Sequence, residues 1–323
     1  MFDFAGKRWW YLSISLGLFL VALAALLAWG LKPGIEFTSG STFTLEFTER
    51  DVTQGEVRDA MQALGHHEVR VQGAGTNKYL IRTEELENSP ALDSAEGPAP
   101  PGEIDQIEAA LSAQFGAVSR SNFSTVSETV STEIARNATI AVVVASVFIL
   151  IYIWAAFRTL PKSYRYGTAA IVAVLHDAFI VLGLFAFLGH VKGTEVDLAF
   201  VTAILTVIGF SVHDTIVVFD RIRENINADP YIPFEEAVNA SMTETLSRSI
   251  NTSLVVLFPV VSMMLIGGET VQNFLLTLLV GIIAGTYSSI CVAAQLLVAW
   301  ENKDLSRFFR KLRGKDGLAA EPA

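Results

Sequence analysis

The chain has 323 residues, of which 51% are hydrophobic and 17% are charged, and its formal net charge is −10. Because a typical soluble domain has roughly 25% charged residues, a chain this apolar cannot hide its hydrophobic surface in water, and lipid is its natural solvent. The negative charge argues against nucleic acid as a partner, and the single cysteine, Cys291, excludes an internal disulfide or a cysteine-based metal site.

Six segments are long and apolar enough to cross a membrane. A spanning helix needs about 20 apolar residues because the hydrocarbon core is roughly 30 Å thick, and only helices or closed barrels satisfy every backbone polar group there. The first segment follows two cations, as in a signal peptide, but it is too long and lacks a small-x-small cleavage pattern, so we expect a retained anchor. The expected spans are residues 10–31, 138–157, 168–188, 198–219, 252–266 and 274–300.

Residues 32–137, between the first two spans, are numerous enough for a small soluble domain. Alternating polar and apolar residues predict a strand at 42–48, and Thr53 with Glu56 forms a capping-box pattern at the start of a helix over 53–64. The order of strands and helices predicts an α+β domain of ferredoxin-like type. The other expected elements are strands at 69–72, 78–82 and 117–126, a helix at 103–115, and a flexible insertion at 88–102.

Lysine and arginine residues gather on one side of the predicted bundle, before the first span and after the second, fourth and sixth. Such cations mark the cytoplasmic side of a membrane. We therefore expect the 32–137 domain to be periplasmic; it carries 17 Asp and Glu against 8 Lys and Arg, which is nearly all of the net charge. The expected divisions are an N-terminal segment and span at 1–31, the domain at 32–137, spans two to six at 138–300 with a cytoplasmic loop at 220–247, and a basic cytoplasmic tail at 301–323.

Two carboxyl groups lie inside the predicted spans, and each follows a histidine: His176-Asp177 in the third span and His213-Asp214 in the fourth. A charged side chain at the bilayer centre costs about 2.5–3.5 kcal/mol, so such residues face the bundle interior and usually mark an ion or proton path. Arg248 precedes the fifth span, at the same cytoplasmic end of the bundle as Asp214.

A buried carboxyl group beside a movable arginine can carry a proton. Burial disfavours the charged carboxylate and a nearby guanidinium favours it, so movement of Arg248 would switch Asp214 between binding and releasing a proton. We expect the nearby hydroxyls of Ser211 and Thr215 to be hydrogen-bond partners of Asp214. His213 could relay protons or only donate a hydrogen bond.

Other interpretations of these charges stay open. His176 and neighbouring backbone could simply satisfy Asp177, and the chain could be a membrane scaffold without conduction. An intramembrane aspartyl protease would need Asp177 and Asp214 within direct hydrogen-bonding range. The Gly-x-Gly-Asp signature of such proteases is absent, because Asp214 follows Ser-Val-His.

Gly281 and Gly285 in the sixth span have the small-xxx-small spacing that lets helices approach closely. The spacing indicates that this span has a close helix neighbour without indicating which one.

Several motifs resemble those of the SecD/SecF family of protein export membrane proteins. Residues 205–224 are similar to the fourth-span signature of the SecF branch, with His213 where Asn is frequent. Residues 34–41 resemble the motif that opens the family's periplasmic domain, with Glu36 for the usual Asp and Ser39 for a Gly. Segments similar to motifs of the third, fifth and sixth spans are 175–177, 247–253 and 285–290.

The resemblance implies a bundle like half of an RND transporter in the bacterial inner membrane, without enzymatic activity. It implies that the chain pairs with a SecD-like subunit, associates with the SecYEG channel and, in many bacteria, with YajC, and uses the proton motive force to assist export of unfolded preproteins. It also implies that Asp214 and Arg248 conduct protons together with an aspartate from the SecD-like subunit. No Walker loop and no ligand-spaced histidines occur, so we expect neither a cofactor nor a metal.

Overall fold

The computed structural model describes residues 3–86, 102–158, 163–268 and 271–302. The expected insertion at 88–102 and the expected basic tail at 301–323 therefore lie almost wholly outside the described residues.

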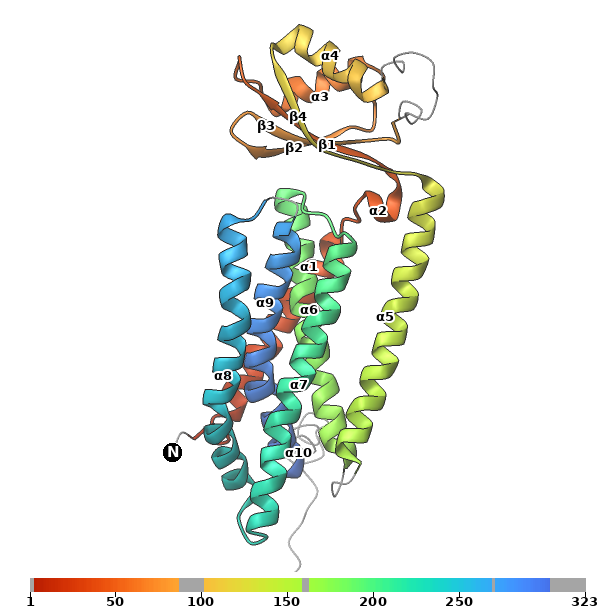
Figure 1. Cartoon of the computed structure of the whole chain (residues 1–323). Helices are drawn as coiled ribbons and strands as arrows, with labels where there is room; N and C mark the ends of the chain where they lie inside the picture. Colours follow the sequence, from red (N-terminus) through yellow and green to blue (C-terminus); the bar gives the residue numbers. More distant parts are fainter. Residues whose placement is uncertain (1–2, 87–101, 159–162, 269–270, 303–323) are drawn as a thin grey trace, which may run out of the picture. The chain divides into compact units, whose positions relative to one another are not determined.

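The chain forms two compact units (Figure 1). The membrane unit comprises Met1–Leu31, Ala141–Leu188 and Ala199–Ala323. The second unit, called here the small domain, comprises Lys32–Ile140 and also Gly189–Leu198, the connection between the third and fourth spans. The sequence pattern alone does not assign this connection to the domain.

The small domain has the βαββαβ order of a ferredoxin-like fold, which confirms the prediction. Its sheet is antiparallel with strand order β2-β3-β1-β4, and both longer helices cover the same face (Figure 1). The elements are α2 (Ile35–Thr38), β1 (Gly40–Phe47), α3 (Gln54–Ala63), β2 (Arg70–Gly75), β3 (Lys78–Thr83), α4 (Glu103–Phe115) and β4 (Val118–Val126).

The core of this domain lies between the sheet and the two helices. Phe43, Leu45 and Phe47 alternate along β1 and are at most 2% exposed, and the Phe47 ring packs edge-on against Phe115 of α4. Period-two burial on the strand facing an apolar helix surface is the packing expected of a two-layer α+β domain.

Helix α3 begins with the predicted capping box. The Glu56 backbone N–H donates to Thr53 Oγ1 at 3.3 Å, and the Thr53 N–H donates to the Glu56 carboxylate at 2.8 Å. The Glu56 carboxylate accepts hydrogen bonds from the Thr53 N–H and from the Thr53 hydroxyl, and these lower the pKa of Glu56 below its ordinary value.

The connection 189–198 is attached to the small domain by polar contacts. Arg82 Nη1 lies 2.5 Å from Glu195 Oε1, and Gln72 Nε2 donates to the Gly193 carbonyl at 3.0 Å. Backbone hydrogen bonds join Val196 to Lys32 and to Gly34 at 2.7 and 2.8 Å. The connection therefore behaves as part of the domain rather than as a free turn between two spans.

Six helical segments are long and apolar enough to cross a membrane, as predicted from the sequence. Five of them extend beyond the apolar stretch predicted for them. The first has the predicted length but is shifted by two residues toward the N-terminus. They are α1 (Arg8–Trp29), α5 (Glu128–Phe157), α6 (Ser163–Lys192), α7 (Leu198–Ala228), α8 (Phe234–Ile266) and a sixth made of α9 (Gln272–Ser288), a π-helical turn (Ser289–Ala293) and α10 (Ala294–Glu301).

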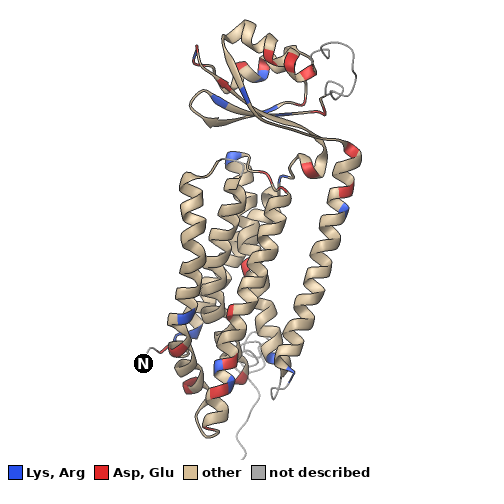
Figure 2. Cartoon of the chain, in the orientation of Figure 1, with Lys and Arg blue, Asp and Glu red and all other residues tan. Residues whose placement is uncertain are grey.

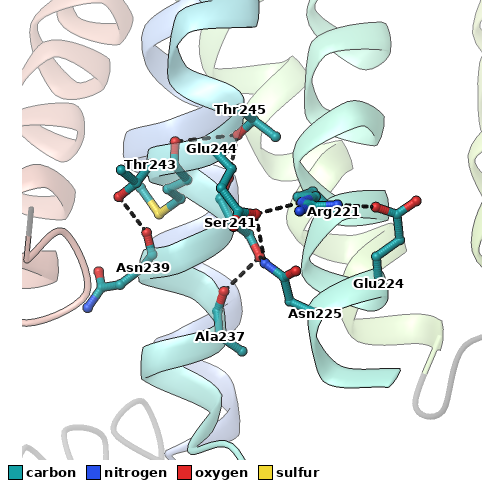
Figure 3. Close-up of polar contacts among 10 residues, drawn as sticks. Arg221, Glu224, Asn225, Ala237, Asn239, Ser241, Thr243, Glu244 and Thr245 are labelled. Carbon is teal, nitrogen blue, oxygen red and sulfur yellow. Dashed lines mark hydrogen bonds and ion pairs between the residues drawn. The ribbon is translucent and has the colours of Figure 1, made fainter. Parts of the chain in front are cut away.

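Polar contacts hold α7 and α8 together past their apolar parts (Figure 3). Arg221 Nε donates to Glu244 at 2.6 Å, and Asn225 Nδ2 donates to Ser241 Oγ at 2.9 Å. These residues belong to the segment 220–247, which we expected to be a loop. Most of it is helical, because the two helices continue beyond the apolar zone and pair their polar faces there.

The glycines of the sixth span identify its close neighbour, which the sequence left open. A Cβ at Gly281 would overlap Val207 of α7, and a Cβ at Gly285 would lie 3.1 Å from Ser211 Cβ, one turn further along α7. Helices α7 and α9 therefore approach along this glycine stripe, as small-xxx-small pairs allow.

Candidate functional site: a polar cluster inside the bundle

The helices of the membrane unit carry almost no charge along their middle lengths, where acidic positions are isolated (Figure 2). Asp177 of α6 is one of them and is fully buried. Its Oδ2 accepts hydrogen bonds at 2.6 Å from both Ser211 Oγ of α7 and Ser288 Oγ of α9. Asp177 thus links three helices through one carboxyl group.

His176 adds a contact from the same helix. Its Nδ1 lies 3.0 Å from Asp177 Oδ1, while its buried Nε2 has no hydrogen-bond partner among the described residues. The prediction that His176 could satisfy Asp177 is correct in part. The other partners are serine hydroxyls from two further helices rather than neighbouring backbone.

Asp214 of α7 is bound less completely. It is 6% exposed, and its Oδ1 accepts a hydrogen bond from Ser249 Oγ of α8 at 2.6 Å. Its Oδ2 is buried without a hydrogen-bond partner in the part of the chain that the structure describes. A buried polar atom left unpaired costs about 1–3 kcal/mol, so this oxygen is available to a proton or to a donor from another chain.

The predicted hydroxyl partners of Asp214 are wrong. Ser211 donates to Asp177, and Thr215 Oγ1 donates to Ser289 Oγ at 3.2 Å. Thr215, one position from Asp214, projects at another angle around α7 and meets Ser289 of the π-helical turn. Ser211, three positions away, shares a helix face with Asp214, but its hydroxyl donates to Asp177 of α6 instead.

Arg248 and His213 are exposed on the surface of the single chain. Arg248 immediately precedes Ser249, the residue that binds Asp214, but no ion pair between Arg248 and Asp214 is present among the described residues. The structure therefore brings Asp214 together with α8 through Ser249, and it leaves Arg248 and His213 turned toward the surroundings.

Sequence reasoning missed several hydroxyls of this cluster as site residues. Ser249 binds Asp214, Ser288 binds Asp177, and Ser253 Oγ lies 2.5 Å from Thr286 Oγ1. Small hydroxyl residues are common in apolar spans and have no period of their own. The available signal was the number of hydroxyl residues in and near the fifth and sixth spans. Several of them lie next to the π-helical turn that begins at Ser289, and π-bulges are frequent at functional sites.

Each carboxyl group has its own serine partners, and no hydrogen bond joins Asp177 to Asp214 within the described residues. The shared proton of an aspartyl dyad requires direct contact, so this arrangement does not fit a protease. Among the described residues, no group of three or more His, Cys, Asp or Glu side chains could hold a metal ion.

Comparisons with known proteins give a consistent result. Residues 106–303 match the family model described as "Protein export membrane protein SecD/SecF, C-terminal". The chain is 42% identical to the protein translocase subunit SecF of Thermobaculum terrenum over 96% of this chain and 98% of that protein. It is 34% identical to the protein translocase subunit SecDF of Bacillus subtilis over 94% of this chain and 39% of that protein.

A solved structure supports the same likeness. The crystal structure of SecDF from Thermus thermophilus, a translocon-associated membrane protein, matches with a TM-score of 0.75 at 32% identity, over 93% of this chain and 39% of that chain. SecDF in its super-membrane-facing form matches with a TM-score of 0.63 over 96% of this chain.

Proposed function

Because this chain belongs to the SecD/SecF family of protein export membrane proteins, we propose that it couples the proton motive force to preprotein export through protonation of Asp214. The observation that carries the proposal is the carboxyl group of Asp214 itself: it is buried, bound by one hydroxyl, and left with one oxygen unpaired among the described residues. Intramembrane carboxyl groups in this situation are typical proton carriers.

The proposal includes a SecD-like partner subunit. The chain covers only 39% of the length of the protein translocase subunit SecDF of Bacillus subtilis, and we propose that a SecD-like part completes the same assembly here. The exposed Arg248 and His213 lie beside the Asp214–Ser249 contact and would face that subunit, which would supply the additional aspartate. The SecYEG channel, YajC and unfolded preprotein are further proposed partners.

The proton step follows from charge and burial. The neutral carboxyl group of Asp214 fits a buried site whose nearest donors are the uncharged hydroxyls of Ser249 and Ser289, whereas the ionised group needs a cation or further donors. Arg248 is adjacent to Ser249 on α8, so a shift of α8 that brings its guanidinium to Asp214 would favour proton release. The small domain would transmit this shift to the emerging preprotein on the periplasmic side, with both termini in the cytoplasm.

The test is proton-driven export in inner-membrane vesicles that contain this chain with the substitution Asp214→Asn. We expect nearly complete loss of the stage that depends on the proton gradient, and no change in the ATP-driven stage. The matched control is Asp229→Asn, in the turn between α7 and α8, which changes the same charge outside the bundle. Gradient-dependent export at the unsubstituted level in Asp214→Asn would reject the proposal.

Arg248 gives a second variant. Arg248→Gln removes the guanidinium, and we expect export to fall by about tenfold, the effect of roughly 1.4 kcal/mol. Arg248→Lys retains a positive charge and should retain part of the activity. Export at the unsubstituted level in Arg248→Gln would show that the cation has no part in the step.

A further inference from the structure

The small domain contains an open cavity of about 430 Å³ lined by α3, the edge strand β2 and the connection 189–198. Four of its lining residues are cations: Lys32, Arg58, Arg70 and Lys192. Among the described residues, no acidic side chain lines it. We call this cavity the basic hollow.

The basic hollow departs from the charge of its surroundings. Segment 32–137 has 17 acidic and 8 basic residues, yet three of those eight, Lys32, Arg58 and Arg70, line one cavity. Three other arginines of the domain, Arg50, Arg82 and Arg120, pair with carboxylates. None of the four cations of the hollow makes an ion pair among the described residues, and the nearby Asp59 and Glu68 do not line it.

The walls of the basic hollow are fixed by hydrogen bonds. Gln54 Nε2 of α3 donates to the Val71 carbonyl of β2 at 2.5 Å, and Gln72 Nε2 of β2 donates to the Gly193 carbonyl at 3.0 Å. The Lys32 carbonyl accepts from the Val196 N–H at 2.7 Å. Three segments far apart in the sequence are thus held together with their cations around one space, which reduces the ordering cost of binding.

Two of the cations stand at the ends of membrane spans. Lys32 follows the last residue of α1, Trp29, by three positions, and Lys192 is the last residue of α6. Val191, which also lines the hollow, is 59% exposed. Cations beside an exposed apolar side chain at a span end match the depth at which phospholipid phosphates lie.

We propose that the basic hollow binds the phosphate of an anionic phospholipid. The lysines reach it from the span ends and the arginines reach it from the domain, while Val191 contacts the upper part of an acyl chain. In the proposed orientation, Lys32 and Lys192 lie on the periplasmic side, where cations near spans are depleted. Binding of a lipid phosphate explains why two cations occur there. Inorganic phosphate shares the headgroup chemistry but not the acyl chain.

An extended peptide added to the edge of β2 is the alternative occupant. The connection 189–198 lies against that edge, since a Cβ at Gly193 would be 2.6 Å from Gln72 Nε2. A strand approaching β2 at Gln72 would have to displace this contact. The edge is therefore partly covered, as is usual for protected edge strands, and the lipid is favoured.

The experiment measures phosphatidylglycerol binding to the full chain in phosphatidylcholine nanodiscs, with retained lipid counted by native mass spectrometry. The double variant Lys32→Gln/Lys192→Gln should lower the affinity by about tenfold or more, because each cation near an anionic headgroup contributes to binding. Arg58→Gln/Arg70→Gln should do the same. Lys32→Arg/Lys192→Arg keeps the charges and should retain binding.

The matched control is Lys78→Gln/Arg136→Gln, which removes two cations of the same unit that do not line the hollow; binding should stay unchanged. An equal loss in the control would overturn the proposal, because only general charge would then matter. Binding of inorganic phosphate as tight as that of the lipid, measured by calorimetry, would overturn the lipid as the source. If the variants of the hollow lose binding of an extended test peptide but keep full lipid binding, the hollow binds a peptide and the lipid proposal is overturned.

Discussion

Asp177 and Asp214 each follow a histidine on an apolar helix, yet the bundle binds them differently. Asp177 is fully buried and has contacts from two serine hydroxyls and a histidine. Asp214 accepts a hydrogen bond from Ser249 and has the Ser289 hydroxyl nearby, and its Oδ2 has no hydrogen-bond partner in the described residues. The first carboxyl group is a junction between helices, whereas the second keeps capacity for a proton or a partner chain.

Under the proposed function, this difference means that burial alone does not make an intramembrane carboxyl group functional. What separates the two residues is how many donors neighbouring helices supply. A fully bound carboxyl group stabilises the bundle, and a partly bound one can change its partners. Stability measurements should therefore respond to Asp177, and transport measurements should respond to Asp214.

The largest expected effect on stability comes from Asp177→Ala. The substitution leaves the hydroxyls of Ser211 and Ser288 without their acceptor, which costs about 1–3 kcal/mol. We expect a lower midpoint of thermal unfolding in detergent. Asp214→Ala removes one acceptor from one hydroxyl and should lower the midpoint less; equal shifts would contradict the comparison.

Gly281→Leu tests the packing that places both serines on Asp177. The new side chain would overlap Val207 and separate α9 from α7, and overpacking of this kind costs about 1–3 kcal/mol. The matched control is Gly17→Leu on α1, where no atom lies within 4 Å of an added Cβ. We expect a lower unfolding midpoint for Gly281→Leu only, and a similar loss in the control would argue against a specific contact.

Ser249→Ala addresses the other carboxyl group. It removes the hydrogen bond to Asp214, and a net hydrogen-bond energy of about 0.5–1.5 kcal/mol corresponds to roughly two- to tenfold slower gradient-driven export. Ser253→Ala is the control, because Ser253 contacts Thr286 rather than a carboxyl group. If both variants export alike, Ser249 has no special part in the proton step.

The smallest effect is expected from an exposed carboxyl group outside the membrane. The pKa of Glu56 is lowered by the Thr53 hydrogen bonds, so its contribution to α3 is complete above the unfolded-state pKa of about 4.3 and is lost as the pH falls through the lower folded-state pKa. Hydrogen exchange at the first turn of α3 should therefore speed up only in acid. In Glu56→Gln, which keeps a capping side chain without titrating, this acid-dependent loss of protection should disappear; if it persists, Glu56 is not its cause.

The sequence predicted much of the fold because local patterns decide it. The capping box at Thr53, the strand alternation along β1 and the lengths of the six apolar segments need only neighbouring residues. The connection 189–198 could not be assigned to the small domain, because Arg82–Glu195 and Gln72–Gly193 join residues more than a hundred positions apart.

The sequence predicted that Asp177 and Asp214 are buried in the bundle, but it did not predict their hydrogen-bond partners. An aspartate within an apolar run is conspicuous, whereas the serine that binds it depends on which helices touch. That contact is set by Gly281 and Gly285 against α7, and the sequence indicated a close neighbour without naming it. Hydrophobicity marks only the apolar parts of α7 and α8, so it does not predict how far the two helices extend. Polar pairs such as Arg221–Glu244 stabilise the helices beyond the apolar zone.

Proton flux tests the central claim most directly. Proteoliposomes containing this chain with a SecD-like subunit, loaded with a pH-sensitive dye, would be given an imposed pH gradient. We predict flux with the unsubstituted complex, none with Asp214→Asn, and none with this chain alone. Flux through the Asp214→Asn complex equal to that of the unsubstituted complex would contradict the assignment of Asp214 as the proton carrier.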